Sequence, residues 1–349
     1  MLASDRFPLR RSPVGAFPLP PVPARFGIRS AAQVARDFGE VARAGLTGQR
    51  FQVDVSSAGL LRPDLSLAAY AGLIPRDGRA PIFNLFDRSG GGRRYTQRVT
   101  RRTLRDFRGG RLSYDEHDGT DFVCPIGTPL VAAAPGTVVM IRDRWLRGGL
   151  TVAVDHGDGL VTQYTHCAEA TAPLGTQVKR GDQVALSGAA GLDLVQFFPW
   201  VPPHVHFMVY VDGIPVDPFL APGEAPRVGT WLDPNEPRTS GPRADDVDAP
   251  ALSAVDEAAL ERIVATCTDA RIREEFAACK NEKAWMAALA EDALAHDGWA
   301  WPAGRAVTVR PNAGGASARH VGLTVPLPVS AYSGIRFADA PWTAPRADD

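Results

Sequence analysis

No apolar stretch of this 349-residue sequence approaches the ~20 residues that a helix needs to cross a bilayer. The sequence also lacks an excess of either charge, because 38 lysine and arginine residues face 39 aspartate and glutamate residues, for a formal net charge of −1. This balance gives no electrostatic basis for binding nucleic acid or an anionic membrane. Lysine is scarce and occurs only at positions 179, 280 and 283, which indicates a compositional bias toward arginine rather than a binding device.

Cysteine is sparse as well, with four residues. Cys167 follows His166 directly, so on a strand its side chain points the opposite way, which argues against a role as a metal ligand. Cys124 lies in the same part of the chain. Cys267 and Cys279 fall in segments with helical periodicity, where they either pair in an oxidising compartment or remain free buried thiols.

The sequence does contain several histidines in strand-like surroundings. The alternating, β-rich run that starts at His204-Val205-His206 predicts a strand. Residues two apart on a strand share a face, with Cα atoms about 6–7 Å apart. One of these histidines can therefore bind a metal ion while the other lies beside it.

Two further motifs supply similar groups. Residues 117–121 read His-Asp-Gly-Thr-Asp, and the glycine permits a bend that brings His117 and Asp121 together. Tyr164 and His166 lie two apart on another expected strand and should share a face. Three protein ligands leave a fourth zinc position open for water, and uncoordinated imidazoles can transfer protons, so the combined pattern predicts a zinc hydrolase.

From His117 to Pro218, a little under a third of the chain, the sequence resembles the lysostaphin-type (LytM-like) zinc metallopeptidases, a family of peptidoglycan endopeptidases. The resemblance is carried by the segments His117–Asp121, Gly127–Ala133, Gly136–Val139, Val154–His166, Val178–Val184, His204–Phe207 and Pro215–Pro218.

The resemblance implies that His117, Asp121 and His206 bind one zinc ion (Zn²⁺) per chain, and that His166 and His204 are catalytic. It also implies a mainly β, antiparallel catalytic core of the duplicated-hybrid or barrel-sandwich type, with an open groove across the metal. The expected activity is that of a zinc metalloendopeptidase. One catalytic histidine takes the proton of the attacking water and passes it to the leaving amine, while the other stabilises the oxyanion.

The implied substrate is a peptide of peptidoglycan, either a stem peptide or a cross-bridge. That substrate places the protein in the periplasm or outside the cell, although the first eleven residues lack the continuous apolar segment of a secretory signal.

Three aromatic residues are candidates for contact with the substrate. Tyr164 either donates a hydrogen bond to the oxyanion or packs in the core. The segment between Gly191 and His204 is longer than the family usually has and carries Phe198 and Trp200. These two side chains either form a wall of the substrate groove or pack against the flanking regions.

The composition and periodicity of the chain divide it into five parts, and the whole is expected to be α+β. These parts are an N-terminal accessory region (1–95), the peptidase domain (96–222), a linker rich in proline and glycine (223–250), a small helical appendage (251–303) and a tail (304–349) whose weak alternation predicts edge strands.

Smaller features within the flanking regions also lead to expectations. Val34, Phe38, Val41 and Ala42 fall on one face of an expected helix. Asn84 is either a plug over the metal groove or a packed core residue. The helical region is a possible site for a protein partner.

The three remaining histidines have no expected part in the site. His156 belongs to a hairpin turn. His296 and His320 have no apparent partners and are expected to be ordinary surface residues.

Two other functional classes compete with an active enzyme. A catalytically inactive or latent relative would act as a cell-wall binding or amidase-activating protein, but such relatives typically lose ligands, and all five residues are present here. A phosphocarrier or lipoyl-type carrier shares some glycine-containing β segments. A lipoyl carrier, however, needs a lysine at a hairpin tip, where Lys179 does not lie, and a phosphocarrier would not require Asp121 and His206 together. Metal content and turnover separate these alternatives.

Overall fold

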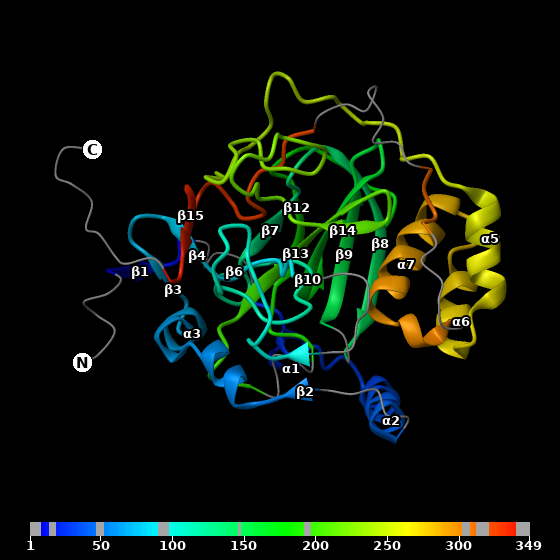
Figure 1. Cartoon of the computed structure of the whole chain (residues 1–349), viewed down its shortest axis with the longest axis horizontal. Coiled ribbons are helices and arrows are strands. Elements are labelled where there is room, and N and C mark those ends of the chain that lie inside the picture. Colours follow the sequence, from blue (N-terminus) through cyan, green and yellow to red (C-terminus); the bar gives the residue numbers. More distant parts are fainter. Residues whose placement is uncertain are drawn as a thin grey trace.

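The computed structural model describes residues 8–13, 19–46, 52–89, 98–145, 148–191, 197–301, 308–311 and 321–339. A large sheet dominates it (Figure 1) and comprises β4 (Arg79–Asn84), β6 (Thr120–Val123), β7 (Pro129–Val131), β8 (Gly136–Arg144), β9 (Gly149–Asp155), β10 (Leu160–Ala170), β11 (Gln177–Val178), β12 (Gln183–Ser187), β13 (His204–Val211), β14 (Ile214–Val216) and β15 (Gly334–Phe337). The main strand order is β11-β8-β9-β10-β13-β6-β4-β15, with β12 paired to β10 and β7, and β14 paired to β13.

The central strands of this sheet are buried on both faces. In β9, Val152 and Val154 belong to the main core, whereas Ala153 between them packs against the C-terminal helices. Val209 and Tyr210 alternate in the same way in β13. This two-sided burial explains why these strands are almost continuously apolar in sequence.

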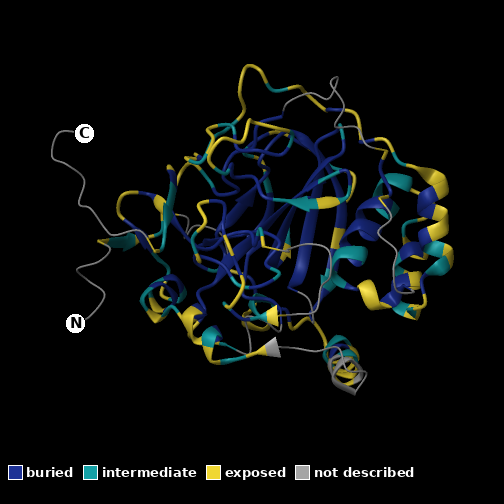
Figure 2. Ribbon diagram, in the orientation of Figure 1, coloured by how far each residue is buried: buried dark blue, intermediate teal, exposed yellow. Residues whose placement is uncertain are grey.

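The C-terminal helices cover one face of the sheet next to β8 (Figures 1 and 2). They are α5 (Glu257–Thr266), α6 (Ala270–Ala278) and α7 (Lys283–His296), followed by the short 3-10 helix η3 (Gly298–Ala300). Asp256 and Asp269 cap α5 and α6 by accepting hydrogen bonds from the backbone N–H groups of Ala259 and Ile272. All residues of α7 from 287 to 293 are buried, so this helix forms the centre of the layer.

In the view of Figure 1, the helices of the N-terminal region lie below the strands of the sheet. The region contains α1 (Val22–Arg25), α2 (Ala31–Leu46), the 3-10 helix η2 (Val55–Leu60) and α3 (Pro63–Tyr70), together with two small sheets, one of β1 (Leu9–Arg11) with β3 (Leu73–Pro75) and one of β2 (Gln52–Val53) with β5 (Arg98–Val99). Its strand β4 pairs with β6. This region therefore contributes a strand to the sheet that carries the functional residues.

Helix α2 contacts the rest of the protein through charged side chains. Asp37 is fully buried, and both Asp37 and Glu40 pair with Arg271 of α6, at 3.0 and 2.7 Å. Phe38 is 57% exposed, and its ring contacts that of Trp145 in a tilted arrangement. Helix α2 therefore docks mainly through Asp37 and Glu40 and not through the expected apolar face with Phe38. The reason is that the largely buried guanidinium group of Arg271 requires carboxylate partners.

The segments after the peptidase region return to the main core. Residues 223–250 form no helix or strand, but Trp231 is fully buried and makes an isolated bridge with Leu323. Val325 and Leu327 lie in the same core, and β15 pairs in parallel with β4 at the edge of the sheet. Within the tail 304–349, Leu323 belongs to the main core, and β15 is the one strand among the residues that the structure describes there.

The expected fold class, a mainly β core with C-terminal helices and α+β overall, is confirmed. The expected strand that starts at His204 is present as β13, and the three helices of the appendage are present. The sheet is mixed rather than wholly antiparallel, because the late strand β15 joins it in parallel. None of the described helices is long and apolar enough to span a membrane.

Candidate metal centre and active site

Two adjacent strands and one loop bring the first three candidate residues together. Asp121 in β6 lies opposite His206 in β13 in the antiparallel register. Such directly opposed residues place their side chains on the same face. His117 lies in the loop that leads into β6. Gly119 is required for close approach, because a Cβ atom there would lie 2.7 Å from both His206 Cε1 and the carbonyl oxygen of Phe207.

Three donor atoms of these residues converge on one point. His117 Nε2 lies 3.2 Å from Asp121 Oδ1 and 3.1 Å from His206 Nδ1, and Asp121 Oδ1 lies 2.7 Å from His206 Nδ1. In a tetrahedral zinc site with bonds of about 2.0–2.2 Å, neighbouring donors are separated by about 3.3–3.6 Å. Two imidazole nitrogens and one carboxylate oxygen are also a donor set that zinc uses. The residues therefore fit a zinc ion.

Each of these three side chains has an outer partner that orients it. His117 Nδ1–H donates to the carbonyl oxygen of Leu85 at 2.6 Å, and Asn84 Nδ2 donates to Asp121 Oδ2 at 2.8 Å. His206 Nε2 contacts Asp118 Oδ1 at 3.1 Å. Outer partners of this kind set the tautomer of a ligating histidine and raise its basicity. Asn84 thus acts on Asp121 from strand β4.

Two further imidazoles lie next to this cluster. His204 Nε2 is 3.6 Å from Asp121 Oδ1, and the rings of His166 and His204 are 4.7 Å apart. His166 Nδ1 donates to the carbonyl oxygen of Ala190 at 2.7 Å, and His204 Nδ1 donates to that of Pro202 at 2.8 Å. A carbonyl oxygen can only accept a hydrogen bond, so Nδ1 carries the proton in both rings. In the neutral imidazoles, Nε2 is then the free proton acceptor.

The environment separates the protonation states of these histidines. Burial, together with neighbouring His204 and His206, holds the pKa of His166 well below its usual value. Burial also lowers the pKa of His204, against the opposing effect of Asp121. Burial alone would lower the pKa of His206, but hydrogen bonds from its ring to Asp118 and Asp121 raise it to about 9. The two carboxylates thus favour a positive charge at His206, whereas the imidazoles of His166 and His204 are neutral bases.

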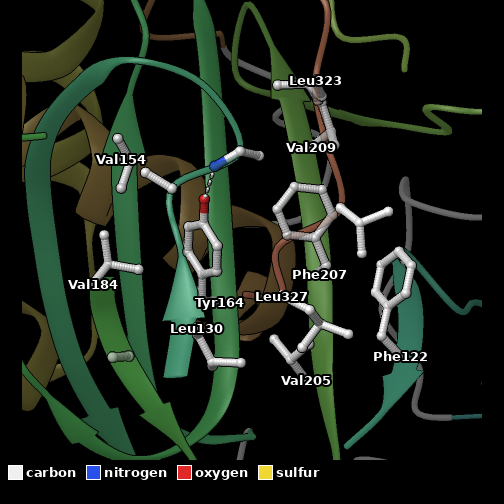
Figure 3. Packing of buried hydrophobic residues seen from close by; sticks show 14 of the residues in the cluster. Phe122, Leu130, Val154, Tyr164, Val184, Val205, Phe207, Val209, Leu323 and Leu327 are labelled. Atoms are coloured by element: carbon white, nitrogen blue, oxygen red, sulfur yellow. Dashed lines mark hydrogen bonds between the residues drawn. The ribbon is translucent and has the colours of Figure 1, made fainter. Parts of the chain in front are cut away.

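Tyr164 does not belong to this site, contrary to the expectation that it contacts the substrate. Its side chain is fully buried in the main core beside Phe207, and its hydroxyl accepts a hydrogen bond from the backbone N–H of Ala133 (Figure 3). The pairing of β10 with β9 shifts register between Tyr164 and Cys167, and His166 has a positive φ of 65°. This irregularity breaks the alternation of faces, so Tyr164 and His166 point in different directions.

Phe198 and Trp200 lie on the loop that leads into His204, and about half of each side chain is exposed. The ring of Phe198 contacts those of Phe26 and Tyr70, at 5.6 and 5.0 Å. The backbone oxygen of Trp200 accepts a hydrogen bond from Arg62. The N-terminal region thus supports this loop while leaving both aromatic faces partly open.

His296 was not expected near the site, and the structure corrects this. Its Nε2 lies 3.1 Å from Asp118 Oδ2, and its side chain is only 14% exposed. Asp118 links it to His206. No sequence pattern marks this contact, because Asp118 and His296 are 178 residues apart.

The other histidines and the cysteines take no part in the centre. His156 is buried in its turn, where its ring contacts the carbonyl oxygen of Pro135 and the hydroxyl of Thr162. His320 lies outside the described residues. The four cysteines are free, so Cys267 and Cys279 do not form a disulfide.

The class of protein follows from these observations. A mainly β domain with a buried His-Asp-His cluster and two adjacent neutral imidazoles has the arrangement of a metallopeptidase. The sequence model of Peptidase family M23 matches residues 115–218, and this part of the chain is an M23 peptidase domain.

Curated relatives and solved structures that are similar to this chain include the following proteins. The chain is 36% identical over 105 residues to the peptidoglycan DD-endopeptidases ShyA and ShyB of Vibrio cholerae serotype O1, and each match covers 30% of this chain and 23% of the relative. The chain thus spans about a quarter of the length of these relatives. Among solved structures, the catalytic domain of lysostaphin from Staphylococcus simulans is 29% identical, with 29% of this chain and 75% of that chain covered and a TM-score of 0.26.

Proposed function

We propose that this protein is a zinc-dependent metalloendopeptidase that hydrolyses peptide bonds in the stem peptides or cross-bridges of peptidoglycan. The convergence of His117, Asp121 and His206, with two free imidazole acceptors beside them, carries the proposal. The M23 match supports peptidase chemistry, and the names of ShyA and ShyB support the substrate class. Since peptidoglycan lies outside the cytoplasmic membrane, we infer that the protein acts in the periplasm or outside the cell.

His117, Asp121 and His206 would hold the zinc ion. Zinc with three protein ligands supplies an acidified water at neutral pH and polarises a carbonyl oxygen. The carbonyl of Leu85 and the amide of Asn84 keep the donor atoms of His117 and Asp121 directed at the common point. We take residues 96–222 as the catalytic unit, to which the N-terminal region adds these two partners.

His166 and His204 would transfer the protons. Their Nδ1–H groups are engaged with backbone carbonyls, which holds each ring in place and leaves Nε2 to accept a proton. One Nε2 takes the proton of the attacking water and returns it to the leaving amine. The proton that this ring takes up gives it an Nε2–H group, which can donate a hydrogen bond to the developing oxyanion before the proton passes to the leaving amine. The other ring stays neutral, with its Nε2 as a second acceptor beside the cluster.

The proposal is tested on intact sacculi. The zinc-loaded protein should release new amino groups, the metal-chelated protein should not, and re-addition of zinc should restore release. Mass analysis of the released fragments names the bond that is cut. If the protein binds one zinc per chain and releases soluble sugar fragments without new amino groups, the endopeptidase proposal is wrong.

A latent form of the same enzyme is a second candidate, because the catalytic side chains are almost covered. His166 and His204 are 6% and 5% exposed. Stoichiometric zinc together with no release of amino groups from sacculi or from soluble cross-linked peptides would favour latency over the active form.

We also propose that Trp200 and Phe198 contact the substrate. Trp200→Ala is expected to raise KM about 3- to 10-fold and to change kcat less than about 2-fold, since an exposed aromatic ring contributes roughly 1 kcal/mol to binding. Trp200 is the better choice because Phe198 also packs against two other rings. Leu174→Ala, at another partly exposed apolar residue, serves as the control. The measurement is steady-state kinetics on a soluble cross-linked peptide. An unchanged KM in Trp200→Ala would refute the contact of Trp200 with the substrate.

A further inference from the structure

A line of polar contacts runs from the helical region to the candidate metal centre. His206 Nε2 lies 3.1 Å from Asp118 Oδ1, and the other oxygen of Asp118 lies 3.1 Å from His296 Nε2. His206 directs its Nδ1 at the convergence point described above. His296 is the last residue of α7 and lies outside the segment that matches family M23.

His296 is itself held in place from its own helix and from the sheet. Its Nδ1 lies 3.1 Å from Asp292 Oδ1 and 3.0 Å from the backbone oxygen of Asp292. Asp292 pairs with Arg142 of β8, which also binds Asp297 at 2.8 Å. The ring of His296 therefore has little freedom to turn away from Asp118.

Asp118 depends on both of its histidine partners. It is only 6% exposed, and a buried carboxylate is costly unless it is paired and hydrogen-bonded. With His296 bound to one oxygen, the other oxygen is aimed at His206 Nε2. A carboxylate in that position keeps the proton of a ligating histidine on the outer nitrogen and leaves the inner nitrogen free to bind metal.

We propose that His296 is a positioning residue for the metal centre, acting through Asp118 on His206, and that the helical region 251–303 is thereby an integral part of that centre. The proposal rests on the proposed zinc site. The affinity for zinc then depends on a residue that the M23 segment does not contain. A purely structural role, in which the contact only docks α7 on the sheet, leaves zinc affinity unchanged.

The test measures zinc affinity by competition with a chromogenic chelator, without substrate. Asp118→Asn is expected to weaken binding about 10- to 100-fold, and His296→Ala about 10-fold. His296→Gln keeps a donor near the position of Nε2 and should restore most of the affinity. In the double variant Asp118→Asn/His296→Ala, the losses should not add, because both residues act through one path.

A matched control and a second readout separate positioning from loss of stability. Thr268→Val removes a 2.8 Å hydrogen bond to the carbonyl oxygen of Ala300 within the same helical region and should leave zinc affinity unchanged. The visible spectrum of the Co²⁺-loaded protein should shift in His296→Ala and not in Thr268→Val. Thermal unfolding of each metal-free variant confirms that it is folded.

The outcomes distinguish this proposal from the proposed function. Zinc affinity of His296→Ala within twofold of the wild type, or an equal loss in Thr268→Val, overturns the positioning role. If the zinc affinities follow the expected order but the protein has no peptidase activity, the result supports the positioning role and counts against the proposed peptidase function. A wild-type protein that binds no zinc overturns both.

Discussion

Asp121→Ala is expected to weaken zinc binding about 10²- to 10³-fold, so that the ion is lost on dialysis, and to lower peptidase turnover in proportion to the zinc that is lost. Asp121 Oδ1 lies within 3.2 Å of the inner nitrogens of both His117 and His206, so its loss opens the centre of the cluster. Sharing about 10–16 kcal/mol of zinc binding among four ligands assigns about 2.5–4 kcal/mol to each, which is a factor of about 10²–10³ in affinity. Asp121 is also the one anion among the three candidate ligands.

Two measurements check this prediction, namely metal content after dialysis and release of amino groups from sacculi. Asp121→Asn keeps the shape of the side chain and removes the charge, so it should bind zinc more weakly than the wild type and better than Asp121→Ala. Asp182→Ala is the control, since that carboxylate only accepts a hydrogen bond from the backbone N–H of Lys179 in a turn. Full zinc content in Asp121→Ala would remove this residue from the ligand set.

His204→Ala and His166→Ala are expected to separate catalysis from metal binding. Each variant should retain about one zinc per chain while kcat falls about 10²- to 10⁴-fold, the range for loss of a general acid or base. The physical reason is that neither imidazole is among the three converging donors, whereas both offer a free Nε2 beside them. A variant that loses zinc together with activity would instead be a ligand.

The pH dependence of the wild type should agree with this assignment. Burial lowers the pKa of both His166 and His204 below 6.5, so both bases stay neutral at pH 7, and kcat should fall only as the pH drops below that ordinary value. His156→Gln is the matched control, because the buried ring of His156 contacts the carbonyl oxygen of Pro135 and the hydroxyl of Thr162 and is not among the three converging donors. It should lower the free energy of unfolding by about 1–3 kcal/mol and leave kcat within about threefold. An acid limb centred above pH 7 would contradict the assignment.

The strands and helices of this protein could be predicted from the sequence because their signals are local. The β-rich run that starts at His204 predicted β13, and helical periodicity predicted the appendage that contains α5, α6 and α7. The order of motifs from His117 to Pro218 led to the same family that the sequence comparison finds at residues 115–218.

Faces of strands were harder to predict where the backbone departs from regular geometry. Tyr164 and His166 would share a face on a regular strand, but the register shift and the left-handed backbone of His166 separate them. A similar limit applies to α2, where, among the side chains that the structure describes, Asp37 is buried and Phe38 is exposed. The periodicity of a sequence predicts which residues lie on the same side of a helix or strand. Which of these sides is buried depends on the helix or strand that packs against it.

The amino-acid sequence by itself determined the mainly β class with C-terminal helices, the M23 segment and the set of candidate histidines, because these depend on local periodicity and on short motifs. Only the tertiary structure decided that Asn84 holds Asp121 and that His296 reaches His206 through Asp118. The contact of Asn84 with Asp121 joins residues that are 37 positions apart, and the contacts of Asp118 with His206 and His296 join residues that are 88 and 178 positions apart. A hydrogen bond depends on a distance of about 3 Å in space, and that distance leaves no pattern along the chain when the two partners belong to separate elements.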